Sequence, residues 1–309
     1  MIRNIFLLVL SALAAWSCTA PDDETASGPQ PADARHSLSI TIAPKPAFTE
    51  AAVTIPDGKN STNTRAVQTE KETKWEQGDV VWLNVVFRDA GGNQNAFYSA
   101  LKYSGSTWRC LTEDEADEFG LKTFGNVPFN RTLIYYNPDG SGKYTDVEIY
   151  ACYTGNGKPD KDGIITFPSP DSGATVPVME ANHDSADFSR PLTLSFTYCC
   201  SRLCIPVGYG LEMANYGYRE KYQVGGSLPG LTSSTDLRLP AADGDRDLFL
   251  LPVADDRATP ASVTLTLNGS AIGTFTPQPA TATGSGAGYY GLSYTLPALG
   301  NGSVTPGDM

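Results

Sequence analysis

Few side chains in this sequence are of types that carry out acid–base chemistry near neutral pH. The 309-residue chain has two histidines, His36 and His183, and histidine is the residue whose unperturbed pKa lies closest to neutrality. His36 falls in a segment rich in Pro, Asp, Ala and Gly, which predicts a flexible tether. His183 has Asp184 beside it, but the members of a triad are aligned by tertiary structure and not by adjacency. Because GxSxG, HExxH and phosphate-loop motifs are also absent, we expect no enzymatic activity and no cofactor.

Cysteines and acidic clusters supply the candidate metal ligands. Apart from Cys18 the number of cysteines is odd, so at least one thiol stays outside a disulfide. These cysteines are Cys110, Cys152, Cys199, Cys200 and Cys204. No CxxC spacing and no nearby histidine complete a site around the last three, which favours buried apolar thiols. The run from Asp243 to Asp247 alternates carboxylates as calcium loops do, but it lacks the later glutamate and predicts a turn. We expect no metal site.

The N-terminus has the layout of a bacterial lipoprotein signal. Arg3 gives it a positive start, residues 5–15 form a short apolar stretch, and small residues lead to Cys18. We therefore predict a signal peptide over residues 1–17 and acylation of Cys18, the alternative being an ordinary cleavage region that happens to contain a cysteine. Two or more acyl chains give stable anchoring, so outer-membrane lipid is a predicted partner. The acidic run 22–24 resembles the signal that sends lipoproteins of some Gram-negative anaerobes to the cell surface.

Charge and composition exclude one class of partner and favour one fold class. The formal net charge is −12 at pH 7 and no basic run occurs, which argues against nucleic acid because phosphate binding needs clustered Lys and Arg. With 30 Gly, 22 Pro and 15 Tyr, the composition is typical of many short strands joined by tight turns. Residues 80–87 are apolar on nearly both faces of a strand, and apolar and polar residues alternate strictly over 192–198. Both patterns indicate strands of a β-sandwich. We therefore predict an all-β protein with two tandem β-sandwiches.

The pattern along the chain predicts how it is divided. Alternation over residues 37–42 indicates a half-buried strand, and a weakly patterned stretch with Pro and Gly near 168–190 separates two strand-rich regions. A capping box at Thr112–Glu115 predicts one short helix whose acidic residues form a solvated face. The predicted segments are a tether over 18–36, an N-terminal sandwich over 37–170, a linker over 171–190 and a C-terminal sandwich over 191–309.

Four motifs in order resemble those of the fimbrillin family, the subunits and accessory proteins of donor-strand pili in Gram-negative anaerobes. Residues 75–83 resemble the family's aromatic-x-x-Gly-Asp-x-aliphatic entry to a core strand, just after the tripeptide Thr64-Arg65-Ala66. The stretches 102–108, 149–153 and 191–207 resemble its Tyr-x-Gly-x-x-Trp hairpin, its Tyr-Ala-x-Tyr strand and the strand that opens its C-terminal domain. This resemblance implies two transthyretin-like sandwiches, secretion as a lipoprotein and assembly outside the cell.

The resemblance also implies how such a subunit would assemble. In polymerising members an arginine-specific protease cuts in the loop after the first strand, and a strand from another pilus subunit fills the groove that is left. Here Arg65 and Ala66 are the implied scissile residues, with Arg35 a poorer candidate because a cut there removes only the tether. The chain is then a structural or accessory subunit of a surface pilus with a role in adhesion, whether as stalk, tip or anchor. The removable strand would carry Leu38, Ile40 and Ile42.

A second interpretation is a surface lipoprotein that binds glycans for a nutrient-uptake system. Sandwich domains bind sugars through exposed aromatic side chains, and Trp75, Trp82, Trp108 and the tyrosines supply aromatic residues here. Packing within strands accounts for the same residues equally well. Asp184-Ser185-Ala186 matches a short O-glycosylation pattern, so Ser185 is a candidate modification site.

Overall fold

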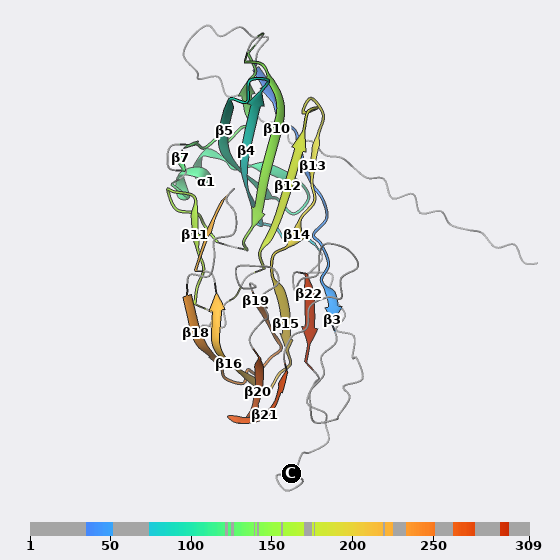
Figure 1. Ribbon diagram of the computed structural model, residues 1–309, viewed down its shortest axis with the longest axis vertical. Coiled ribbons are helices and arrows are strands. Elements are labelled where there is room, and N and C mark those ends of the chain that lie inside the picture. Colours follow the sequence, from blue (N-terminus) through green and yellow to red (C-terminus); the bar gives the residue numbers. More distant parts are fainter. Residues whose placement is uncertain are drawn as a thin grey trace, which may run out of the picture.

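The regular secondary structure of the computed structural model is almost entirely β-strand. The structure describes residues 35–51, 74–120, 123–124, 127–138, 140, 142–155, 157–169, 175, 177–218, 220–224, 233–250, 262–275 and 291–296. Within these ranges there is one α-helix, α1 (Glu113–Glu118), and the strands form several sheets, distributed between an upper and a lower part of the molecule (Figure 1). The prediction of an all-β fold is confirmed.

A six-stranded antiparallel sheet forms the upper part of the molecule in Figure 1. Its strands, in order, are β14 (Thr197–Tyr198), β12 (Met179–Ser185), β10 (Tyr144–Tyr153), β4 (Val80–Asp89), β5 (Gln94–Tyr103) and β6 (Trp108–Cys110). β4 lies inside the sheet, between β10 and β5. Most of its side chains are buried on both faces, so the prediction of a central core strand over 80–87 is confirmed.

Each face of this sheet has its own apolar cluster, because successive side chains of a strand point to opposite faces. Val81, Leu83 and Val85 of β4 belong to one cluster, which we call the first cluster. Trp82 belongs to a second cluster on the opposite face. That second face is covered by β11 (Ile164–Thr166) and β17 (Lys221–Gln223), which pair with each other, and by Phe119 at the end of α1. The rings of Trp82 and Phe119 meet edge to face with centroids 5.5 Å apart.

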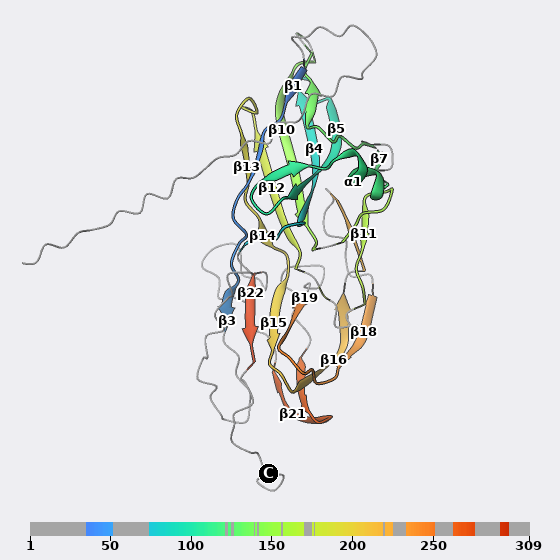
Figure 2. The ribbon, with the colours of Figure 1, turned by 180° about the vertical axis from the view of Figure 1, so that it is seen from behind.

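Two four-stranded sheets form the lower part of the molecule (Figures 1 and 2). One has the order β19 (Arg246–Leu250), β15 (Ser201–Ile205), β22 (Leu292–Thr295) and β3 (Thr49–Ala51). The other has the order β18 (Ser233–Leu239), β16 (Tyr209–Tyr218), β20 (Val263–Leu267) and β21 (Ser270–Phe275). Side chains from both sheets share one apolar cluster, so the two sheets enclose a common core as sandwiches do.

The remaining strands form short pairs. β1 (Arg35–Ser37) pairs with β9 (Ile134–Tyr136) in antiparallel fashion, and β2 (Ile40–Ile42) pairs with β13 (Leu192–Leu194) in parallel fashion. β7 (Thr123–Phe124) and β8 (Val127–Pro128) form a further antiparallel pair. The pairs β1–β9 and β2–β13 therefore join residues 35–42 to strands far along the chain.

The predicted linker over residues 171–190 needs correction. Met179–Ser185 inside it forms β12, which pairs with β10 in the six-stranded sheet. Beyond it, Leu192 and Leu194 of β13 lie in the first apolar cluster with the side chains of β4. Alternation identifies a strand but not the core that it joins, so the sequence pattern does not reveal that these residues belong with the six-stranded sheet. The division into two sandwich domains stays a prediction.

The predicted tether over 18–36 also extends too far, because Arg35 and His36 already lie in β1. The single strand predicted over 37–42 is divided in two. Leu38 donates its backbone N–H to the carbonyl of Leu133 at 2.9 Å, and the carbonyl of Ser39 accepts from the N–H of Leu192 at 2.9 Å. The chain thus changes partner between β1 and β2.

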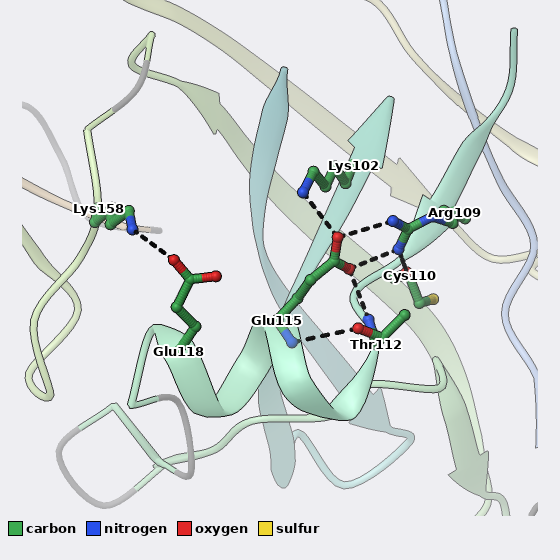
Figure 3. Close-up of polar contacts among 7 residues, drawn as sticks. All are labelled: Lys102, Arg109, Cys110, Thr112, Glu115, Glu118 and Lys158. Atoms are coloured by element: carbon green, nitrogen blue, oxygen red, sulfur yellow. Dashed lines mark hydrogen bonds and ion pairs between the residues drawn. The ribbon is translucent and has the colours of Figure 1, made fainter. Parts of the chain in front are cut away.

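Glu115 fastens α1 to the sheet. Its carboxylate accepts hydrogen bonds from Lys102 Nζ on β5 at 2.7 Å and from two guanidinium nitrogens of Arg109 on β6 at 2.7 and 2.8 Å (Figure 3). With Thr112 it also closes the predicted capping box. The expected solvated face is therefore wrong for Glu115. Hydrogen bonds from Arg109, then those from Lys102 and the Thr112 backbone, hold the pKa of Glu115 well below its ordinary value of 4.5.

Replacing Glu115 by Gln should lower the stability of the fold by about 1–2 kcal/mol at pH 7, because an amide keeps the capping box but loses both cations. A carboxyl whose pKa is lowered by folding stabilises the protein above its unfolded pKa, and this contribution is lost as pH falls through the folded pKa. The difference between wild type and Glu115→Gln should therefore be full above pH 4.5 and shrink at lower pH. Urea unfolding at a series of pH values measures it.

Glu118→Gln on the same helix is the matched control. Glu118 lies 3.6 Å from Lys158 with its side chain 69% exposed (Figure 3), and exposed ion pairs contribute about 1 kcal/mol or less. Equal losses for the two variants, or a Glu115→Gln loss that does not change with pH, would contradict the role given to Glu115.

Candidate functional site

The first described segment, residues 35–51, runs along both parts of the molecule. In Figure 2 it begins with β1 at the upper end of the six-stranded sheet and ends with β3 in the lower part. It contributes β1, β2 and β3, each three residues long, to three different sheets. Figure 1 shows it descending beside β13 and β14 toward β22. We call this stretch the N-terminal segment.

Parallel pairing attaches the N-terminal segment to strands that are remote in sequence. Ile40 and Ile42 of β2 are in register with Leu192 and Leu194 of β13. Further on, β3 pairs in parallel with β22, with Thr49 opposite Leu292. β3 is the last strand in its sheet, so β22 would become an edge strand without it.

Apolar side chains of the N-terminal segment complete the first cluster. Four of them belong to it and are at most 9% exposed, namely Leu38, Ile40, Ile42 and Phe48. Burial of an apolar side chain of this size contributes roughly 1.5–3 kcal/mol. Removing the segment would thus expose the apolar side chains of the first cluster that it covers. The placement of the three predicted strand residues in a core agrees with their alternation.

Phe48 is the member of this set that sequence reasoning missed. Its ring stacks on Tyr198 with centroids 3.8 Å apart, lies 6.0 Å from the ring of Phe249, and faces the guanidinium of Arg202 at 5.6 Å. Pro44 and Pro46 separate Phe48 from Ile42, and a proline cannot donate to a strand ladder. The alternation that reveals a strand is therefore interrupted before Phe48.

Several predicted residues lie outside the described residues. They are Cys18, Arg65 and Ala66, together with the whole predicted signal peptide. Arg65 falls in the stretch 52–73 between β3 and the residues that precede β4. A cut there would leave the N-terminal segment attached to the rest of the chain by pairing and packing alone. A cut at Arg35 would leave β2 and β3 in place.

The two histidines and Ser185 occupy separate places. His36 lies on β1 and stacks on Tyr135 with ring centroids 5.5 Å apart, whereas His183 lies on β12 opposite Ile149. The hydroxyl of Ser185 donates to the carbonyl of Asp187 at 3.0 Å at the end of β12. The candidate acid–base residues therefore lie in different sheets.

All five cysteines beyond Cys18 are thiols, and none is joined in a disulfide. Burial raises the pKa of Cys152 and that of Cys200, the latter to about 12, and burial also raises the pKa of Cys204. Thiols held protonated in this way are weak nucleophiles and poor metal ligands. In the part of the chain that the structure describes, no three His, Cys, Asp or Glu side chains come together where they could hold a metal ion.

The tryptophans of the described residues, Trp75, Trp82 and Trp108, pack against other aromatic side chains. Trp82 is 1% exposed, and Trp75 meets Trp108, Tyr153 and Phe196 edge to face with centroids 5.1–5.6 Å apart. Among the described residues, the exposed large apolar side chains are Tyr136 and Val207. Trp82 is therefore part of the core, and Trp75 and Trp108 are half-buried against other aromatic rings; glycan binding stays a prediction.

No family model matches the sequence, and no curated protein matches it. Among solved structures, a proposed cell adhesion protein from Bacteroides uniformis matches at 16% identity, covering 72% of this chain and 88% of the other with a TM-score of 0.41. One from Bacteroides ovatus matches at 12% identity over 72% and 82%, also with a TM-score of 0.41.

A fimbrial assembly protein from Parabacteroides distasonis matches at 11% identity, covering 69% of this chain and 81% of the other with a TM-score of 0.34. Within the described residues no helix has the length and apolar character needed to cross a bilayer.

Replacing Ile40 by Ala should destabilise the intact protein by about 2–4 kcal/mol, because the change leaves a cavity in the first cluster. Thr41→Ala is the matched control on the neighbouring position, where the side chain points away from that cluster; its expected cost is about 1 kcal/mol or less. Urea unfolding of both variants measures the difference. Similar losses for the two would mean that the N-terminal segment is not part of the cooperative core.

Proposed function

We propose that this chain is a structural or accessory subunit of a cell-surface pilus that assembles by β-strand donation and takes part in adhesion. The observation that carries this proposal is the N-terminal segment. It contributes Leu38, Ile40, Ile42 and Phe48 to the first apolar cluster, yet its strands are short and pair with strands remote in sequence. Such a segment can be replaced by an equivalent strand from another subunit.

The N-terminal segment, once released, is expected to be replaced by another strand, because its loss leaves strand edges unpaired. Without the segment, β13 loses its β2 partner and β22 loses its β3 partner, and unpaired strand edges bind other extended chains. The incoming strand would restore the ladder hydrogen bonds, and its alternate side chains would fill the pockets left by the apolar residues. The partner is therefore an extended segment of another subunit.

Proteolysis is the proposed trigger. A cut after Arg65 by an arginine-specific protease removes the covalent link between the N-terminal segment and the strands that hold it. The location follows from the sequence, which places Arg65 between β3 and β4. Acylation of Cys18 is proposed to hold the uncut chain in the outer membrane at the cell surface, with the cut releasing the remainder from that anchor. No catalytic activity is part of this proposal.

Treatment of the purified full-length chain with an arginine-specific protease should give a new N-terminus at Ala66, followed by loss of the monomer and appearance of larger assemblies. Mass spectrometry identifies the cut, and size-exclusion chromatography follows the assemblies. Arg65→Lys should resist the cut and stay monomeric, since lysine keeps the charge and is not a substrate of such an enzyme.

Arg35→Lys is the matched control, and it should be cut and assemble as the wild type does. A chain cut at Ala66 that keeps residues 35–51 bound and remains monomeric would overturn the proposal of strand donation. Recovery from intact cells of a chain that begins only at acylated Cys18 would restrict the protein to an uncut anchor.

A further inference from the structure

The N-terminal segment places one cation in the interior of the molecule. Lys45 follows Ile42 and lies with its side chain 9% exposed, 3.7 Å from Oδ2 of Asp79, whose side chain is 10% exposed. Its Nζ also lies 5.2 Å from the ring centroid of Trp75 and 4.9 Å from that of Tyr153. An aromatic face attracts a cation, and the attraction grows when water is excluded. We call Trp75, Asp79 and Tyr153 the Lys45 pocket.

The pocket is built by residues that the N-terminal segment does not supply. Trp75 and Asp79 flank a turn in which Asp79 N–H donates to the carbonyl of Glu76 at 3.0 Å, and Gly78 has a φ of +99°. Such a turn needs glycine at its third position. Tyr153 comes from the end of β10. The pocket would therefore remain on the chain after the segment has left.

Asp79 is fixed in place before any cation arrives. Oδ1 accepts a hydrogen bond from the hydroxyl of Tyr153 at 2.9 Å, and Oδ2 accepts one from the backbone N–H of Glu76 at 2.8 Å. Burial, and then the charge of Asp79, raises the pKa of Tyr153, so its hydroxyl remains a donor. The carboxylate keeps its position, but a buried charge without a counter-charge is costly.

The segment is also tied to the pocket through its backbone. Trp75 donates its indole N–H to the carbonyl of Ala43 at 2.9 Å, two residues before Lys45. This hydrogen bond fixes the register in which the segment lies when Lys45 contacts Asp79. The Lys45 pocket therefore constrains both the register of the N-terminal segment, through Ala43, and its charge, through Lys45.

We propose that the Lys45 pocket is a selectivity site for the strand that replaces the N-terminal segment, and that it requires a Lys or Arg in that strand. The inference rests on the proposed function, namely release of the segment. The chain's own segment defines the pattern: apolar residues at Leu38, Ile40 and Ile42, then a basic residue at the position of Lys45. A strand with an acidic or neutral residue there leaves Asp79 buried and uncompensated, which disfavours it.

The test uses the full chain with a recognition sequence for a site-specific protease inserted within residues 52–73, so that the cut does not depend on Arg65. After cutting, a fluorescent peptide of residues 35–51 is added, and its binding is followed by anisotropy. Lys45→Arg in the peptide should change its Kd by no more than about threefold, because a guanidinium also binds aromatic faces. Lys45→Met should weaken binding by about tenfold or more, because it keeps the stem and loses the charge.

A matched peptide separates the pocket from general attraction to an acidic protein. Arg35→Met removes the same charge at an exposed position of β1 and should bind as the wild-type peptide does. On the side of the chain, Asp79→Asn should weaken binding of the wild-type peptide and strengthen that of the Lys45→Met peptide, because the amide removes the buried charge that methionine leaves unpaired. Equal binding of the wild-type and Lys45→Met peptides would overturn the proposal.

Failure of strand donation would give a different result. If the cut chain keeps its own segment and binds no peptide, release is wrong, and the pocket is tested in the uncut chain. Urea unfolding of Lys45→Met, Asp79→Asn and the double variant should then give effects that are clearly non-additive, since the second change removes a partner already lost. Additive effects would show that Lys45 and Asp79 do not interact, which would overturn the pocket itself.

Discussion

The fold depends on covering the apolar face of the six-stranded sheet that holds the first cluster. A sheet with one bare apolar face is unstable in water and needs another layer. Part of that layer comes from the N-terminal segment, whose Leu38, Ile40 and Ile42 enter the same cluster as Leu83 and Val85 of β4. The start of the chain and the centre of the sheet are thus stabilised by one core.

The same segment also deals with strand edges. β3 is the edge strand of the four-stranded sheet that contains β15 and β22, and β2 is the partner of β13. These strands are three residues long, and a backbone hydrogen bond contributes only about 1 kcal/mol net. Burial of each large apolar side chain contributes roughly 1.5–3 kcal/mol. Side-chain burial therefore holds the segment in place more than its ladder bonds do, which suits a segment that can be exchanged for one of similar pattern.

The ion pairs of Glu115 and Asp79 position elements of this molecule. Glu115 joins α1 to β5 and β6, and Asp79 receives Lys45 from the N-terminal segment. Desolvation of an ion pair offsets much of its attraction, so the net stabilisation by such a pair is small beside that of an apolar cluster. In this chain they fix the position of a helix and of a segment, while the apolar clusters supply the driving force.

The sequence by itself determined the local features: the strand over 80–87, the alternation of Leu38, Ile40 and Ile42, and the capping box that begins α1 at Glu113. These depend on neighbours within a few residues, where periodicity and side-chain chemistry act directly. Only the tertiary structure decided that β12 and β13 join the first core, that Phe48 follows Ile42 into it, and that Lys45 meets Asp79. Each of these contacts joins residues that are distant in the chain or separated by prolines, and a local pattern carries no information about which distant partner a strand or charge will find.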